Sequence, residues 1–267
     1  MRLSNLFKIL IAFILIMLAA ATYINWGAPS TSAEKAEAFY YKGVNENTIA
    51  ARASAFNSAL TEFSLIESSS STDFSTGKLY YNIGNTYFQL EDYPLAILYY
   101  SKAQVLMPNS KELENNLSLA RSKLSLPPHK NSSWLNVLLL DPWIPLPRRI
   151  QLFTLLVTLT ALLYSLFIWK GGKSVKSAAI CLSLLTALTL INLAAARYLS
   201  PIEAVVTKPA FLRQNSGASY PKVENIPLIA GSTVEVIELS DDKKWVKIIL
   251  EEGTIGFVPT DTIRLIR

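Results

Sequence analysis

The sequence predicts a multi-domain membrane protein with an all-α repeat segment, a two-helix transmembrane hairpin and a small all-β barrel. Three observations lead to this fold class. Two uncharged runs of about 20 residues lie between Ile150 and Leu199, and each is long enough to cross a ~30 Å hydrocarbon core. Before them, apolar residues recur at helical spacing, and after them the chain breaks into short β-type runs. Both flanking regions must therefore lie outside the bilayer, on the same side.

The hairpin is expected to span residues 150–169 and 177–199, with a basic cytoplasmic turn at residues 170–176. Helices of soluble proteins keep a polar face, and these two runs have none. Small residues that would let the two backbones approach closely lie on one face of each span: Thr154, Thr158, Ala161 and Ser165, then Ala179, Ser183 and Ala187. The alternative, that small residues are simply common in spans, stays open. Asn192 is expected to hydrogen-bond the other helix.

Charge distribution and cysteine content argue against a nucleic-acid-binding protein and against a disulfide-linked one. The net charge is +5, yet residues 31–126 and 201–267 each carry slightly more acidic than basic side chains. The basic excess lies beside the apolar segments, where it orients the chain and meets lipid head groups, so a nucleic-acid partner is not expected. The single cysteine, Cys181, allows no intramolecular disulfide and is expected to be a small packing residue.

Residues 1–27 have the pattern of a signal sequence or an N-terminal membrane anchor. Arg2 and Lys8 precede an apolar run that ends in small residues near Ala21. The chain beyond this leader is then exported, and the lysines of the turn at residues 170–176 stay in the cytoplasm. Arg148 and Arg149 oppose that orientation under the positive-inside rule.

The region 31–126 is expected to be helical. A capping pattern at Thr31 opens a first helix that runs through Tyr41, and Gly43 is suited to end it. A second helix, residues 48–67, carries Ala59, Phe63 and Ile66 on one face, and residues 111–124 form a further helix.

The most specific pattern in the chain lies between these helices, at the spacing of a 34-residue helix-turn-helix: Tyr80, Ile83, Gly84, Tyr87, Ala96, Tyr100, Ala103 and Pro108. This pattern resembles the tetratricopeptide repeat. Gly84 and Ala96 are small where two helices touch, and Pro108 ends the second helix. One repeat cannot bury its own faces, so the flanking helices are expected to form a degenerate preceding repeat and a following repeat or cap.

A linker rich in Pro and Trp, residues 127–149, leads to the hairpin, and the last region, residues 201–267, reads as short strands separated by turns. Its pattern resembles a bacterial SH3 domain through Leu212, Gly231, Trp245 and the run from Gly253 to Val258. Phe257 stands where that family usually has Trp. The polyproline-binding pattern of the eukaryotic domains is absent.

The order of leader, tetratricopeptide segment, linker, hairpin and SH3-like domain resembles the BatE-type proteins of the Bacteroides aerotolerance (Bat) group. The resemblance covers nearly the whole chain but rests on domain order more than on single residues. It implies a protein of the bacterial inner membrane whose N- and C-terminal domains face the periplasm. It also implies MoxR-type ATPases and von Willebrand factor A-domain membrane proteins as partners, and a role in envelope or oxidative-stress tolerance.

The leading functional hypothesis is a non-enzymatic scaffold that binds protein partners. Motif alignment places four candidate partner-binding residues in the repeat groove: Tyr81, Asn85, Phe88 and Gln89. An ordinary exposed helix face is the open alternative for them. A second hypothesis is a cell-wall accessory that binds peptidoglycan through the SH3-like domain, with Trp245 and Phe257 as candidates unless they belong to the barrel core. No catalytic residues, metal ligands or cofactor site are predicted, because the sequence has no nucleophile–base pair, metal-spaced cluster or phosphate loop.

Overall fold

The computed structural model describes residues 31–69, 77–128, 144, 146–198 and 201–266. The chain divides into two compact units, each described by itself below. One contains the helices that precede residue 133 together with the C-terminal sheet, and the other contains the apolar hairpin. The expected leader and most of the linker lie outside the described residues.

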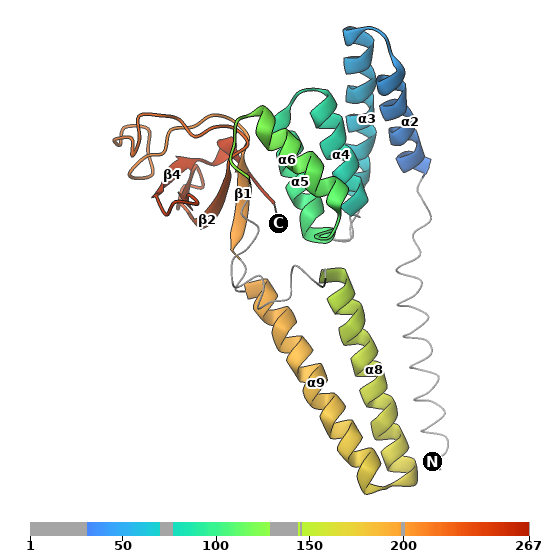
Figure 1. Cartoon of the computed structure of the whole chain (residues 1–267). Coiled ribbons are helices and arrows are strands. Elements are labelled where there is room, and N and C mark those ends of the chain that lie inside the picture. The colour runs from blue at the N-terminus through green and yellow to red at the C-terminus, as the bar shows by residue number, and fades with distance from the viewer. Residues whose placement is uncertain (1–30, 70–76, 129–143, 145, 199–200, 267) are drawn as a thin grey trace. The chain divides into compact units, whose positions relative to one another are not determined.

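Five helices form the N-terminal part of the first unit as successive antiparallel neighbours (Figure 1). They are α2 (Thr31–Asn45), α3 (Ile49–Ser69), α4 (Gly77–Gln89), α5 (Tyr93–Leu106) and α6 (Lys111–Lys123). Asp92 caps α5 by accepting a hydrogen bond from the backbone N–H of Leu95, and Ser110 caps α6 through that of Leu113. These caps fix where the two helices of the repeat region begin.

Gly43 does not end the first helix, contrary to the sequence-based expectation. It lies inside α2, which continues to Asn45. A Cβ atom at this position would lie 2.7 Å from Cε1 of Phe56, a ring that is 1% exposed. Glycine is needed here for the close approach of α2 and α3 rather than for a helix stop.

The contact between α4 and α5 follows the repeat pattern. Ile83, Ala96, Tyr100 and Ala103 are buried, and a Cβ atom on Gly84 would lie 2.6 Å from the ring of Tyr100. Tyr80 and Tyr87 pack half-buried against the same core. The predicted seam is therefore present at these positions.

The C-terminal part is a five-stranded antiparallel sheet in the order β4-β3-β2-β1-β5. Its elements are β1 (Ile202–Val206), β2 (Thr233–Leu239), β3 (Trp245–Ile249), β4 (Ile255–Pro259), the 3-10 turn η1 (Thr260–Thr262) and β5 (Ile263–Leu265). Alternate residues Val246, Ile248 and Val258 point into one core, as strand periodicity requires. The register between β2 and β3 shifts between Val236 and Glu238.

Helices and sheet share one hydrophobic core within this unit. Val205 of β1 and Ile266, which directly follows β5, belong to the same buried cluster as residues of α5 and α6. Gly231 (φ +96°) lies so close that a Cβ there would be 2.6 Å from Cδ1 of Leu124. The guanidinium of Arg121, which is 3% exposed, donates to the carbonyl of Pro127 and to Oγ1 of Thr233. The expected helical and sheet domains are thus parts of one packed body.

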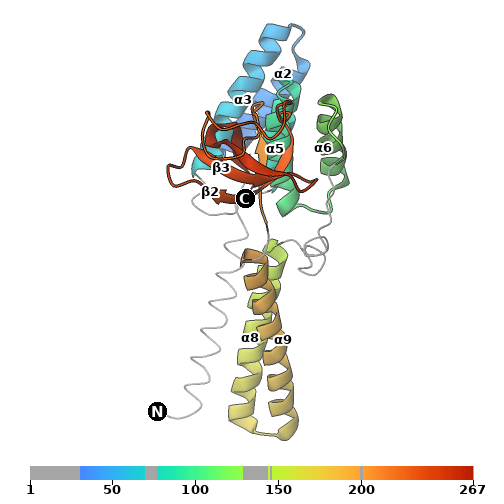
Figure 2. The same ribbon diagram turned by 90° about the vertical axis from the view of Figure 1, so that its left-hand side faces the viewer.

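The second unit is an antiparallel pair, α8 (Leu146–Lys170) and α9 (Lys173–Tyr198), whose helices run side by side in Figures 1 and 2. Gly171 and Gly172, both at positive φ, form the turn. Both helices are long and apolar enough to cross a membrane, and only 11% and 6% of their most apolar stretches are buried. Core helices of soluble proteins are mostly buried, whereas most of this apolar surface is exposed among the described residues.

The contact between α8 and α9 differs in part from the predicted stripes. Ser165 and Ala179 are buried there, but Ala187 is exposed, and Leu156 and Thr160 join the seam unexpectedly. The residues of α9 that contact α8 are spaced three or four positions apart in the sequence. The predicted stripe used a spacing of four throughout, and a stripe with that spacing turns gradually away from the partner helix.

Polar side chains also link the two helices of the hairpin. Asn192 accepts a hydrogen bond from Nη1 of Arg149 at 3.4 Å, so its predicted bond to the other helix is confirmed. The hydroxyls of Thr160 and Thr186 lie 3.2 Å apart. The prediction for Cys181 is wrong, because its side chain is exposed on the outside of the pair.

Candidate functional site

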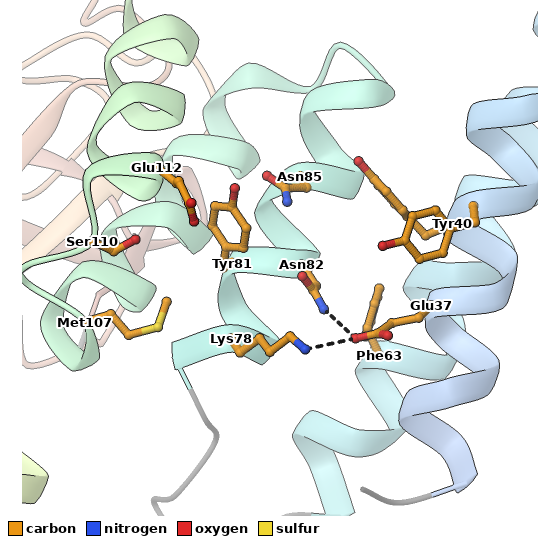
Figure 3. Close-up of a pocket in the computed structure, with 11 residues that line it drawn as sticks. Glu37, Tyr40, Phe63, Lys78, Tyr81, Asn82, Asn85, Met107, Ser110 and Glu112 are labelled. Atoms are coloured by element: carbon orange, nitrogen blue, oxygen red, sulfur yellow. Dashed lines mark hydrogen bonds and ion pairs between the residues drawn. The ribbon is translucent and has the colours of Figure 1, made fainter.

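A cavity of about 410 Å³ opens beside α2, α4 and α6, each of which is the first helix of a helix–turn–helix pair or its equivalent. We call this cavity the repeat groove. The helices α2, α4 and α6 supply most of its walls (Figure 3). Its lining residues are Glu37, Tyr40, Tyr41, Phe63, Lys78, Tyr81, Asn82, Asn85, Met107, Ser110 and Glu112.

The spacing of residues along α4 explains why one helix can serve both core and groove. Tyr81 and Asn82 follow Lys78 by three and four residues and precede Asn85 by four and three, so these side chains share the face of α4 that lines the groove. Ile83 and Gly84 lie on the other side and are buried. The groove face of α4 therefore differs from the face that carries Ile83 and Gly84, although Tyr81 also packs against the core of α5 and α6.

Two of the four predicted partner-binding residues, Tyr81 and Asn85, line the groove. Asn85 also has a structural role, since its Oδ1 accepts hydrogen bonds from the hydroxyl of Tyr100 at 2.8 Å and from Nδ2 of Asn116 at 3.1 Å. Asn116 in addition donates to the hydroxyl of Tyr81 at 3.0 Å. The side-chain amide nitrogen of Asn85 has no hydrogen-bond partner among the described residues. This N–H group is therefore the part of Asn85 that can donate a hydrogen bond to a ligand.

Phe88 and Gln89 are not part of the cavity lining. Phe88 packs on the α5–α6 core and meets Tyr93 edge-on at 5.4 Å between ring centroids. Gln89 accepts a hydrogen bond from Nη2 of Arg52 at 3.3 Å. Their assignment to partner binding stays a prediction.

The sequence did not point to the groove residues outside α4. Tyr40 and Tyr41 come from α2, and Glu112 from α6. Tyr41 is 61% exposed, and burial raises the pKa of the Tyr40 phenol. Aligning the first helix of every pair with α4 would have indicated them, because equivalent helices of a repeat array line the same surface.

Charges in the groove are arranged around Glu37. Its Oε1 accepts a hydrogen bond from Nδ2 of Asn82 at 3.2 Å and lies 3.7 Å from Nζ of Lys78 (Figure 3). Glu112 has no hydrogen-bond or ion-pair partner among the described residues. The groove therefore combines tyrosine rings with an excess of carboxylate.

The two sheet candidates lie outside the sheet core. Trp245 and Phe257 are half-buried and alternate with the core residues Val246 and Val258. Nζ of Lys247 lies 6.0 Å from the ring centroid of Phe257. Phe257 exchanges two backbone hydrogen bonds with Arg213, at 2.8 and 2.9 Å. Both rings belong to the outer surface of the β3–β4 pair.

Comparison with known proteins identifies one segment. The tetratricopeptide repeat family model matches residues 77–110, which are α4, α5 and the turn that follows. No curated protein and no solved structure matches the chain significantly. The repeat indicates binding to protein partners in general. Among the described residues there is no group of three or more His, Cys, Asp or Glu side chains that could hold a metal ion.

Proposed function

We propose that this protein is a non-enzymatic membrane scaffold that binds a protein partner in the repeat groove. One observation carries the proposal: a cavity of about 410 Å³ lies on the first-helix side of a tetratricopeptide repeat and is lined by tyrosine, amide and charged side chains. An exposed ring such as that of Tyr41 supplies apolar area at a low entropy cost, and amides such as Asn85 pair with backbone groups. This combination suits an extended or helical peptide.

The same proposal places the protein in the bacterial inner membrane with both flanking regions in the periplasm. The exposed apolar surface of α8 and α9 supports the bilayer, and the shared core of helices and sheet supports a common side for residues 31–128 and 201–266. The three lysines near the turn favour a cytoplasmic location for it. Arg149, which opposed this orientation, is 5% exposed and bonded to the carbonyl of Ile144 and to Asn192.

The resemblance in domain order to BatE-type proteins extends the proposal to physiology. It suggests that the partners are von Willebrand factor A-domain membrane proteins and a MoxR-type ATPase, and that the complex serves envelope or oxidative-stress tolerance. The single matched repeat is compatible with this assignment but specific only for protein binding.

The test of partner binding in the groove uses the full chain with Tyr41→Ala and Tyr81→Ala combined. Complexes are cross-linked in membranes and purified, and the amount of partner recovered is compared with that of wild type. Truncating aromatic anchors typically costs about 2 kcal/mol or more, roughly thirty-fold in affinity. Leu65→Ala is the control, since Leu65 is 56% exposed on α3 and does not line the groove. Equal recovery of partners by the double variant and wild type would contradict the proposal.

A second candidate function is peptidoglycan binding by an SH3-like sheet domain. The five-strand order and the 3-10 turn before β5 are compatible with that fold. The outward position of Trp245 and Phe257 favours a surface role for both rings. Sedimentation of the detergent-solubilised chain with purified sacculi tests it: Trp245→Ala should reduce the bound fraction, and a chain that never sediments with sacculi would eliminate this function.

A further inference from the structure

The repeat groove has too few free cationic groups to hold an anionic peptide. Lys78 is the only Lys or Arg among the described residues that line it, and it faces Glu37 at 3.7 Å. The side-chain amide of Asn82, which also lines the groove, donates a hydrogen bond to the same carboxylate. A carboxylate that entered the groove would have to compete with Glu37 for both donors. It would also meet the charge of Glu112.

A cationic side chain finds better partners there. Glu37 on α2 and Glu112 on α6 stand on opposite walls, with Tyr81 between them (Figure 3). Rings of Tyr40, Tyr41 and Tyr81 line the same space. The face of an aromatic ring attracts ammonium and guanidinium groups, and the long stems of Lys and Arg pack against apolar surface. Glu112, which has no partner among the described residues, supplies a carboxylate for the charged end.

We infer that the segment bound in the repeat groove is a peptide with a Lys or Arg side chain between apolar residues. This inference rests on the proposed function, because it specifies the ligand of the same groove. The cation lies between the tyrosine rings, and its charge is balanced by Glu112 and, on the other wall, by Glu37. Neighbouring apolar residues pack on Tyr41 and Met107.

The experiment uses the full chain in lipid nanodiscs and a phage library of random 12-residue peptides. Peptides retained by wild type but not by the Tyr41→Ala/Tyr81→Ala variant are sequenced, and the best one is synthesised. A second synthetic peptide replaces its Lys or Arg by norleucine. We expect the groove-dependent peptides to be enriched in Lys and Arg, and the norleucine peptide to bind more weakly.

Charge variants of the protein then identify the carboxylates. Glu112→Gln and Glu37→Gln should each lower the affinity for the synthetic peptide by up to about fivefold, which is the range for exposed ion pairs. The decrease should be smaller at high salt, because salt screens the charges. Glu114→Gln and Glu34→Gln are matched controls, because both are exposed on the same two helices and neither lines the groove. The controls should bind as wild type.

The outcomes separate the inference from the proposed function. Groove-dependent peptides that are neutral or acidic, or basic peptides unaffected by both glutamine variants, would overturn the inference and leave the groove as a binding site. A library that yields no peptide dependent on Tyr41 and Tyr81 would overturn both.

Discussion

At the scale of single residues, the contact between α4 and α5 depends on Gly84. A Cβ on Gly84 would lie 2.6 Å from Cδ1 and 2.7 Å from Cε1 of Tyr100. The ring cannot move aside easily, because it is 1% exposed and its hydroxyl is bonded to Asn85. Any side chain at this position must therefore push the two helices apart.

The substitution Gly84→Leu should lower the stability of the helical region by about 1–3 kcal/mol, the usual cost of overpacking. Thermal unfolding of the purified full chain, followed by circular dichroism at 222 nm, measures it. Ser118→Leu is the control, because it adds the same side chain at an exposed position of α6. A melting temperature equal to that of wild type would show that the α4–α5 contact is not as close as described.

Residue identities predicted the repeat's seam and two groove residues, but not the bonding of Asn85. Gly84, Ala96 and Tyr100 are recognisable because their sizes fit a fixed helix crossing. The role of Asn85 depends on Asn116, which lies 31 positions away on α6. No local pattern in α4 could indicate that contact.

At the scale of elements, periodicity predicted the helices and strands well, whereas their ends and contacts depended on neighbours. Glycine commonly ends helices, and the sequence therefore predicts that Gly43 ends α2. The helix continues to Asn45, and Gly43 packs closely against the ring of Phe56. The α8–α9 seam includes Leu156 and Thr160 because the two helices meet along a stripe that composition alone does not define. Arg121, in the last turn of α6, is buried and donates a hydrogen bond to Thr233, a contact between segments 112 positions apart that no local pattern indicates.

Tyrosines of α2, α4 and α5 should make the folded state sensitive to alkaline pH. Burial raises the pKa values of Tyr40, Tyr87, Tyr99 and Tyr100, and the charge of Glu67 adds to the effect on Tyr99. The neutral phenols contribute their full stabilisation below about pH 10, the pKa of an unfolded tyrosine. Above it, tyrosines of the unfolded chain lose protons first, so the free energy of unfolding falls as pH rises.

Melting temperatures recorded between pH 8 and pH 11 test this expectation. Wild type should lose stability above about pH 10, and Tyr99→Phe should lose less over the same interval. The slopes are compared rather than the absolute values, because Tyr99→Phe also removes the hydrogen bond to Glu67. Tyr41→Phe, at an exposed ring of α2, is the control. Identical slopes for wild type and Tyr99→Phe would exclude this phenol as a source of the pH dependence.

At the scale of the whole molecule, the chain leaves one packed body, forms the hairpin and returns to the same body. Val205 and Ile266 follow the hairpin in sequence, yet they share a core with α5 and α6, which precede it. A shared core requires both flanking regions to lie on one side of any membrane that α8 and α9 cross. The sequence predicted the common side from the even number of spans, but not that the two regions touch, since that contact rests on Gly231 and Arg121.

Cysteine labelling tests both the common side and its identity. In a Cys181→Ala background, single cysteines replace Ser118 on α6, Ser216 before β2 and Ser174 near the hairpin turn, all exposed. An impermeant thiol reagent added to intact spheroplasts should label the first two and not the third, and permeabilisation should expose the third. Labelling at Ser174 alone would reverse the orientation and leave the shared core intact. Labelling at only one of Ser118 and Ser216 would contradict the shared core itself, because two segments packed around Val205 cannot lie on opposite sides of a bilayer.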